Sequence, residues 1–206
     1  EASKPDDTDD AWPMSREEAL TVILDRMPAN TVFCATTGRA TRELFFLRER
    51  RGEAHSCDFL NVGAMGHASS VGLGIALERK ERPVAVLDGD GACLMHMGAM
   101  TMISKVEAPN FLHIVLNNGA HDSVGGQRTA GTLSDLTKIA EGCGYATVGK
   151  PVTARDELAA AVTALRQAGR AGFVDCRIHK GLSRKLPPLV FDHREAADRL
   201  IRELNT

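Results

Sequence analysis

Short apolar runs alternate along the chain with longer segments in which apolar residues recur every three or four positions. Runs of about four to eight apolar residues are typical of buried strands, and the longer periodic segments are typical of amphipathic helices. Strands that alternate with helices over a whole chain predict an α/β fold, with a mostly parallel sheet sandwiched by helices. We expect the strands at residues 31–35, 57–62, 84–87, 112–116, 145–148 and 172–178.

The first helix carries a start signal. Ser15 and Glu18 form a capping-box sequence before apolar positions with helical spacing, and Met27-Pro28 should end that helix. The segment 63–76 is rich in Gly and Ser, which predicts a helix whose backbone approaches a neighbour closely. The Met-rich segment 94–106 is interpreted as a buried core helix. The other helices are expected at 41–51, 133–143, 154–168 and 193–204.

The chain is expected to hold one domain behind a short leading segment. Residues 1–13 are acidic and lack apolar periodicity, which is typical of a linker or a tail. The full length of 206 residues suffices for one substantial domain and is short for two, so residues 14–206 should form that domain. Because the first residue is Glu1 rather than Met, we expect a chain that is processed, trimmed or the downstream part of something longer.

Composition excludes several classes of function. The net charge of −2 gives no electrostatic footprint for a nucleic acid. No apolar run reaches the length of about 18 residues that a membrane span needs, and no signal peptide is visible, so we expect a cytoplasmic protein. The cysteines are odd in number and lack paired spacing, which favours reduced, non-catalytic thiols. They are Cys34, Cys57, Cys93, Cys143 and Cys176.

Polar residues follow two of the expected strands. Asp90 comes just after the strand 84–87, and Asn118 just after the strand 112–116. The carboxyl ends of parallel strands meet at one edge of a sheet, where ligands bind in open α/β folds. A carboxylate and an amide oxygen there suit a magnesium ion that takes its other ligands from a phosphorylated molecule. Taken singly, each motif could also be an ordinary turn.

The two motifs together resemble a known signature. Gly89-Asp90-Gly91 is followed, after twenty-five residues, by Asn117-Asn118. This pattern is similar to the diphosphate-binding signature of thiamine diphosphate (ThDP) enzymes, and it implies that residues 14–206 are a ThDP-binding fold, the diphosphate-binding domain. By this resemblance the ligands of a Mg²⁺ ion are Asp90, Asn118 and, through its backbone carbonyl, Ala120.

The resemblance also assigns the diphosphate contacts. The backbone N–H groups of Gly91 and Ala92, next to Gly89, begin the following helix and should face phosphate. A second helix entrance, Thr36-Thr37-Gly38, suits the terminal phosphate. The two threonines could instead simply cap the helix.

A further turn extends the likeness. Gly63-Ala64-Met65-Gly66 fits the Gly-x-hydrophobic-Gly turn that precedes Gly-Asp-Gly in ThDP enzymes. The resemblance implies that Met65 is the wedge that holds the cofactor bent, and that the carbonyl of Gly63 holds the 4′-amino group of the cofactor. On position alone, Met65 could equally be a core residue.

Within the ThDP enzymes the chain resembles the phosphonopyruvate decarboxylases, with the sulfopyruvate decarboxylases as nearest relatives. The segments 36–45, 89–98 and 116–127 carry this likeness, which covers about residues 30 to 130. It implies decarboxylation of phosphonopyruvate to phosphonoacetaldehyde and CO₂, a step of phosphonate biosynthesis. Two places depart from the pattern, Arg39-Ala40 near the phosphate and Arg128 after Gln127.

The substrate of such an enzyme is strongly anionic and needs cations or hydrogen-bond donors. The candidate catalytic residues are His121, Ser123 and Gln127, with Arg128 beside them on the same loop. His121 could instead be a hydrogen-bonded loop residue. His67 and His96 are interpreted as structural residues within helices.

The resemblance implies a partner. ThDP enzymes of this type use a second, pyrimidine-binding domain that supplies an activating glutamate, and this chain has room for only one domain. We therefore expect the glutamate from another polypeptide or from an upstream portion, in a dimer or higher hetero-oligomer. The chain would be the diphosphate-binding subunit or half of that enzyme.

Three other interpretations compete. A sulfopyruvate decarboxylase beta-type subunit would use the same chemistry on a different anion, and a non-catalytic ThDP-binding subunit would regulate or scaffold a partner. A generic nucleotide-binding protein would need a Gly-x-Gly-x-x-Gly or a Gly-Lys-Ser/Thr loop, and the sequence has neither. Because residues in strand-end turns are usually exposed, Asp90→Ala should abolish Mg²⁺-dependent ThDP binding and leave the fold intact.

Overall fold

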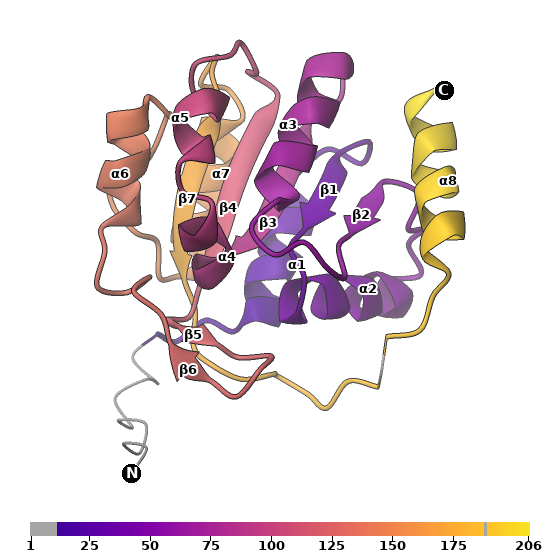
Figure 1. Ribbon diagram of the computed structural model, residues 1–206, viewed down its shortest axis with the longest axis horizontal. Coiled ribbons are helices and arrows are strands. Elements are labelled where there is room, and N and C mark those ends of the chain that lie inside the picture. The colour runs from indigo at the N-terminus through magenta and orange to yellow at the C-terminus, as the bar shows by residue number, and fades with distance from the viewer. Residues whose placement is uncertain (1–11, 188) are drawn as a thin grey trace.

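Five parallel strands form the central sheet of the computed structural model, which describes residues 12–187 and 189–206 (Figure 1). The spatial order is β2-β1-β3-β4-β7. The predicted parallel α/β fold is therefore confirmed, whereas most of the predicted acidic segment 1–13 lies outside the described residues. The strands are β1 (Val32–Ala35), β2 (Asp58–Leu60), β3 (Val84–Gly89), β4 (Phe111–Asn117) and β7 (Gly172–Arg177).

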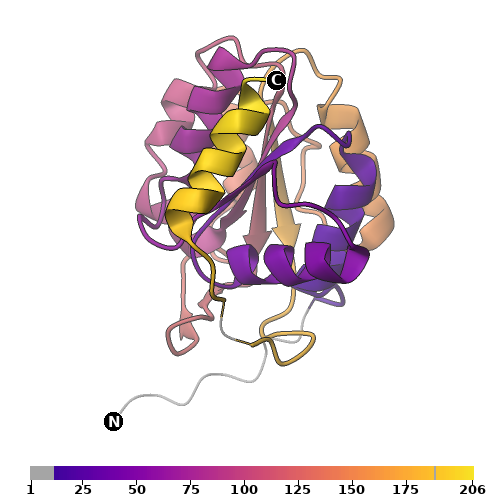
Figure 2. The ribbon, with the colours of Figure 1, turned by 90° about the vertical axis from the view of Figure 1, so that its right-hand side faces the viewer.

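Helices cover both faces of the sheet, so that the molecule has three layers when seen along the sheet (Figure 2). One face carries α1 (Arg16–Arg26), α2 (Arg39–Arg51) and α7 (Arg155–Leu165) over one apolar cluster. The other face has a second apolar cluster. It carries α3 (Ala68–Glu78), α4 (Asp90–Met95), α5 (Ala99–Ile103) and α6 (Leu136–Cys143).

The sheet has one covered edge and one small hairpin beside it. The last helix, α8 (His193–Leu204), has the predicted bounds and packs against the edge strand β2. Two short antiparallel strands, β5 (Ala120–His121) and β6 (Gln127–Arg128), lie below the carboxyl ends of the parallel strands in Figure 1.

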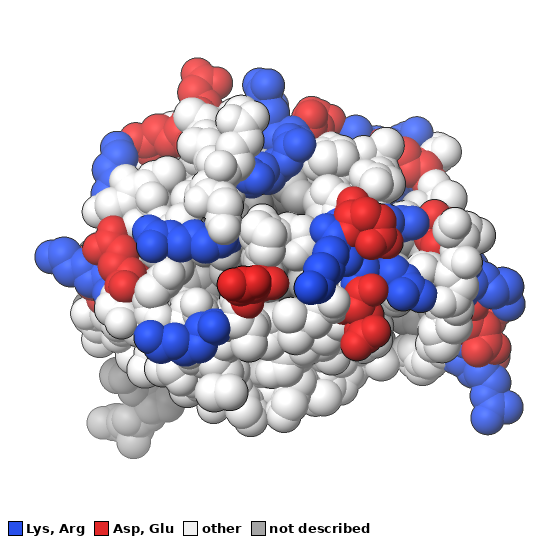
Figure 3. Space-filling view, turned by 90° about the horizontal axis from the view of Figure 1, so that it is seen from above, with Lys and Arg blue, Asp and Glu red and all other residues white. Residues whose placement is uncertain are grey.

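At the opposite end of the sheet, Lys and Arg side chains alternate with Asp and Glu side chains (Figure 3). Within the described residues no helix is both long and apolar enough to span a bilayer.

The start of α1 follows the predicted capping box. The Ser15 side chain accepts a hydrogen bond from the backbone N–H of Glu18, and the Glu18 carboxylate accepts one from the backbone N–H of Ser15. These contacts satisfy donors that a helix N-terminus otherwise leaves unpaired. They also fix where α1 begins, which places Arg16 at the first helical position.

The Met-rich segment is not one helix, and that prediction was wrong. It forms two short helices, α4 and α5, that are separated at residues 96–98. Gly98 precedes α5, and glycine is a poor helix-interior residue because it loses more backbone entropy than other residues. Met100 is buried as expected, but the side chains of Met95 and Met102 are 57% and 65% exposed.

Other boundaries also differ from the prediction, and the helix expected at 133–143 begins only at Leu136. Residues 63–67 form a turn, and helix α3 begins only at Ala68. The predicted strand 145–148 is reduced to an isolated bridge between Ala146 and Gly172. The expected close approach of α3 is present, because a Cβ on Gly72 would lie 2.5 Å from Val86 Cγ2.

Candidate functional site

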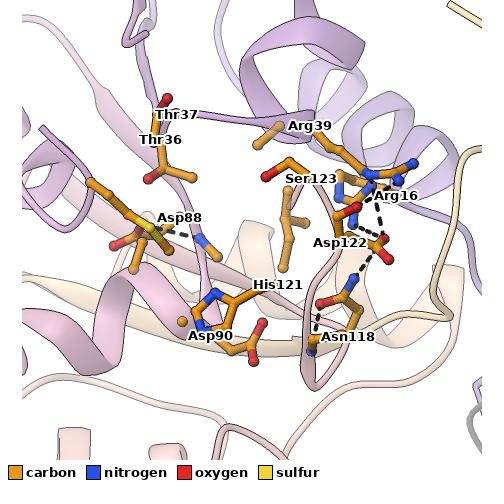
Figure 4. A pocket seen from close by; sticks show the side chains of 17 residues that line it. Arg16, Thr36, Thr37, Arg39, Asp88, Asp90, Asn118, His121, Asp122 and Ser123 are labelled. Atoms are coloured by element: carbon orange, nitrogen blue, oxygen red, sulfur yellow. Dashed lines mark hydrogen bonds and ion pairs between the residues drawn. The ribbon is translucent and has the colours of Figure 1, made fainter. Parts of the chain in front are cut away.

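A cavity lies where the carboxyl ends of β1, β3 and β4 meet, and most of the predicted site residues line it (Figure 4). These strands are neighbours in the sheet, so the residues that follow them fall at one edge. The predicted residues in the lining are Thr36, Thr37, Met65, Gly89, Asp90, Gly91, Ala92, Asn118, Ala120, His121 and Ser123.

Three predicted residues lie outside the lining. Gly38 is the N-cap of α2, at φ +103°, and a Cβ there would lie 3.0 Å from Ser123 Oγ. Gly63 is exposed in the turn before α3, where its N–H donates to Asn61 Oδ1 at 3.0 Å. Gln127 is exposed on β6, as is Arg128.

Asp90 is almost completely enclosed within the site. Its side chain is at the start of α4, only 1% of the residue is exposed, and the Thr129 hydroxyl donates a hydrogen bond to it. Gly131 covers the carboxylate so closely that a Cβ on this glycine would lie 2.5 Å from Asp90 Oδ2. The expectation of an exposed turn residue was wrong, because the chain returns over Asp90 after the β5–β6 hairpin.

The burial of Asp90 has an electrostatic consequence. Desolvation raises the pKa of this carboxyl, although the hydrogen bond from Thr129 works in the opposite direction. A buried anion is costly unless a cation or several donors compensate it. The carboxylate of Asp90 therefore suits a site that a cation completes.

The two asparagines after β4 have different surroundings. Asn117 is fully buried, and its Nδ2 donates to the Gly131 carbonyl and to Asp175 Oδ1 at 2.9 and 3.0 Å. Asn118 faces the cavity, where its Oδ1 accepts the N–H of Ala120 at 3.1 Å. Asn117 thus anchors the loop, and Asn118 presents an amide group to the site.

The helix entrance at Thr36 has an unpaired hydroxyl. Thr36 is 4% exposed, lines the cavity, and its Oγ1 has no hydrogen-bond partner among the described residues. Gly38, rather than either threonine, is the N-cap of α2, and no side chain caps this helix. Capping therefore does not explain Thr36. Because a buried unpaired hydroxyl costs about 1–3 kcal/mol, its position favours a ligand oxygen in the cavity.

Met65 lies on the wall of the cavity and belongs to neither apolar cluster, which argues against the alternative of a core residue. It follows Ala64, whose φ of +44° is rare for a residue with a side chain. Such strained backbone is retained where the surrounding structure requires it, commonly at functional sites.

His67 and His96 lie at helix ends rather than inside helices, are exposed, and have ring centroids 4.1 Å apart.

Four charged residues of the lining were not among the predicted site residues. Asp88 is fully buried beside His113, with 3.1 Å between Oδ2 and Nε2. Arg16 comes from the start of α1 and Arg39 from the start of α2, and both reach Asp122 in the loop after Asn118. Asp122 follows the predicted His121 directly, which is a signal that the sequence offered. Arg16 gave no such signal, because it reaches the site only through the tertiary packing of α1.

The cysteines do not line the cavity. Cys34, Cys93 and Cys176 are buried, and burial raises the pKa of Cys34 to about 12. A thiol with so high a pKa stays protonated at neutral pH and is a poor nucleophile.

Comparison with known proteins identifies the family. Residues 37–176 match the family described as thiamine pyrophosphate enzyme, C-terminal TPP binding domain, where thiamine pyrophosphate (TPP) is another name for ThDP. The chain belongs to this family. The matched residues of this ThDP-binding domain include all the predicted Mg²⁺ ligands and exclude α1 and α8.

Two relatives differ in the share of their length that this chain covers. The chain is 43% identical over 156 residues to a phosphonopyruvate decarboxylase of Streptomyces viridochromogenes, and the alignment covers 75% of this chain and 38% of that protein. It is 33% identical over 136 residues to sulfopyruvate decarboxylase subunit beta of Methanococcus maripaludis, covering 66% and 70%. The chain therefore spans about two fifths of the first protein and most of the second.

A solved structure shows the same fold. A putative thiamin diphosphate-dependent enzyme from Mycobacterium smegmatis superposes with a TM-score of 0.67 at 20% identity. The superposition covers 81% of this chain and 32% of that chain.

Proposed function

We propose that the chain is the diphosphate-binding half of a ThDP- and Mg²⁺-dependent decarboxylase that converts phosphonopyruvate to phosphonoacetaldehyde and CO₂. The observation that carries the proposal is the cavity itself, where the buried Asp90 carboxylate, the Asn118 amide and Ala120 converge. The 43% identity to a phosphonopyruvate decarboxylase supports the choice of substrate.

The residues present fit the two groups that such an enzyme needs. Asp90, Asn118 and the carbonyl of Ala120 are hard oxygen donors, which is the ligand type that Mg²⁺ prefers. Backbone N–H groups of Gly91 and Ala92 at the start of α4, with the unpaired Thr36 hydroxyl, would bind the diphosphate. When bound, ThDP supplies the electron sink that makes loss of CO₂ from a 2-oxo acid possible.

Substrate contacts are assigned to the loop after Asn118. His121 and Ser123 both line the cavity, so they are the candidates for hydrogen bonds to the anionic groups of the substrate. The His121 ring lies over Gly91, where a Cβ would be 2.5 Å from Cε1. Gly91 therefore leaves room for the imidazole at this place. Gln127, which is exposed on β6 outside the lining, remains a third candidate.

Met65 is assigned the role of holding the bound cofactor in its bent shape. A bulky side chain at this position would hold the two rings of ThDP in a bent arrangement, and the carbonyl of Gly63 would hold the 4′-amino group. The half-buried Met65 in a strained turn supports this role.

A partner completes the proposed enzyme. The activating glutamate would come from a pyrimidine-binding domain or subunit, in a dimer or higher hetero-oligomer. The limited span of this chain, 38% of the phosphonopyruvate decarboxylase, supports a missing second domain.

Sulfopyruvate is the second candidate substrate. The chain covers 70% of a protein named as subunit beta of sulfopyruvate decarboxylase, which favours a split enzyme of that kind. Turnover separates the two: CO₂ release is measured from phosphonopyruvate and from sulfopyruvate in parallel, using the chain with its co-purified partner. The proposal expects release from phosphonopyruvate only when ThDP and Mg²⁺ are both present. Release from sulfopyruvate alone would reassign the substrate, and release without either cofactor would contradict the proposed chemistry.

A further inference from the structure

The carboxylate of Asp122 joins Asn118 to a buried arginine (Figure 4). Its Oδ2 accepts a hydrogen bond from Asn118 Nδ2 at 2.9 Å and lies 3.3 Å from Arg16 Nη2. The backbone N–H of Gly181 donates to the same oxygen at 2.9 Å. The Asp122 side chain is only 12% exposed, so these contacts are shielded from water.

Two contacts fix which way the Asn118 amide faces, the Asp122 carboxylate at Nδ2 and the Ala120 backbone N–H at Oδ1. A side-chain amide can turn by 180° and exchange its oxygen with its NH₂ group, whereas an ionised carboxylate only accepts hydrogen bonds. The end that faces Asp122 must therefore be the NH₂ group, and Oδ1 is left on the other side. There it accepts the Ala120 N–H and keeps a second lone pair.

Building on the proposed function, in which Asn118 Oδ1 is a ligand of the metal, we propose that Asp122 is a positioning residue for that ligand. It holds the amide of Asn118 in the one orientation that offers oxygen to Mg²⁺. Residues that orient metal ligands in this way contribute about 10–100-fold to metal affinity.

Two of the residues that bind the Asp122 carboxylate lie outside the segment that matches the family. Arg16 in α1 and Gly181 after β7 both lie beyond residues 37–176. Arg16 is 5% exposed and also pairs with Glu43 at 2.8 Å, so its guanidinium is fixed from two sides. Arg39 adds a hydrogen bond from Nη2 to the Asp122 carbonyl at 2.7 Å. Through Asp122, the start of α1 and the segment after β7 therefore help to fix the orientation of the proposed metal ligand Asn118.

If Asp122 had only a structural role, it would simply anchor α1 and the segment at Gly181. Exchanging the side chains of Asn118 and Asp122 distinguishes that anchoring role from the positioning of Asn118. Asp122→Asn replaces the acceptor-only carboxylate with an amide that can also donate, so only the Ala120 N–H still selects the orientation of the Asn118 amide. The double variant Asn118→Asp, Asp122→Asn reverses the hydrogen bond and keeps the charge count, and either oxygen of a carboxylate at 118 can serve the metal.

The test is Mn²⁺ binding to the full chain with inorganic pyrophosphate, followed by electron paramagnetic resonance, with thermal unfolding of each variant in parallel. Asp122→Asn should bind Mn²⁺ about 10–100-fold more weakly. The double variant should return to within a few-fold of the wild type, and the exposed Asp156→Asn should match the wild type.

Wild-type affinity in Asp122→Asn would overturn the inference and leave the proposed function standing. An exchanged pair that binds as weakly as Asp122→Asn would also overturn it, because the anchoring role would then be the whole effect. Absence of Mn²⁺ binding in the wild type would contradict the proposed metal site and this inference together.

Discussion

Gly131 packs directly over the carboxylate of Asp90, with space for a hydrogen atom but not for a methyl group. A Cβ on Gly131 would lie 2.5 Å from Asp90 Oδ2, and this glycine does not have a positive φ that would by itself exclude a side chain. The conflict in Gly131→Ala is therefore with the carboxylate. Asp90 is thus held in place by a residue forty-one positions later in the chain.

Gly131→Ala should weaken Mg²⁺-dependent ThDP binding, because the new methyl group displaces the Asp90 carboxylate. Calorimetric titration of ThDP at fixed Mg²⁺ measures the loss, which we expect to be at least about tenfold. Gly74→Ala is the matched control, since a Cβ there meets nothing within 4 Å and the position is helical. That variant should bind ThDP normally and gain about 0.5–1 kcal/mol of stability. Equal affinity in the two variants would show that the position of Asp90 does not matter.

Asp90→Asn should separate binding from stability. The variant removes a buried negative charge whose pKa is raised by desolvation, so the ligand-free chain should unfold at a higher temperature than the wild type. The same variant should lose Mg²⁺-dependent ThDP binding. Thermal unfolding and ThDP titration measure the two effects. A lower unfolding temperature together with retained binding would contradict the assignment of Asp90 as a buried metal ligand.

The stability gain of Asp90→Asn should depend on pH. Since the folded-state pKa of Asp90 lies above its unfolded value, the folded wild type takes up a proton first as the pH falls, and its stability rises through that range relative to the variant. The difference in unfolding temperature between the two proteins should be largest at neutral pH and shrink on acidification. Differential scanning calorimetry from neutral to acid pH tests this, and a difference that grows on acidification would have the wrong sign.

Thr36→Val should affect ligand binding only. The Thr36 hydroxyl has no partner among the described residues, so its removal should leave the stability of the ligand-free chain unchanged or slightly raised. ThDP affinity should fall about 10–100-fold if the hydroxyl donates to a charged phosphate. Thr31→Val is the matched control, because Thr31 also has a buried hydroxyl without a partner but lies outside the cavity lining. A similar loss of affinity in both variants would argue against a phosphate contact at Thr36.

The parts of the site that could be predicted from sequence lie next to strand ends. Asp90 and Asn118 each follow an apolar strand, and the parallel α/β order places such residues at one edge. Thr36 follows the same rule after β1. These predictions needed only local sequence, because each residue follows the end of its strand within a few positions.

The remaining parts depend on contacts between distant segments. Thr129 and Gly131 bury Asp90 only because the chain folds back after the β5–β6 hairpin, and Arg16 reaches Asp122 across 106 positions. Neither relation leaves a pattern in the sequence. The break between α4 and α5 was missed for a different reason, since apolar methionines continue through it and hide the interruption.

The most direct test of the account is the titration of ThDP into the wild-type chain and Asp90→Asn, each with Mg²⁺ and with a chelator. We expect saturable binding of ThDP to the wild type in Mg²⁺ and loss of that binding in the chelator. Asp90→Asn should show no Mg²⁺-dependent binding while it unfolds cooperatively. ThDP binding that is equal with and without Mg²⁺, or unchanged in Asp90→Asn, would contradict the assignment of this cavity as the metal–diphosphate site.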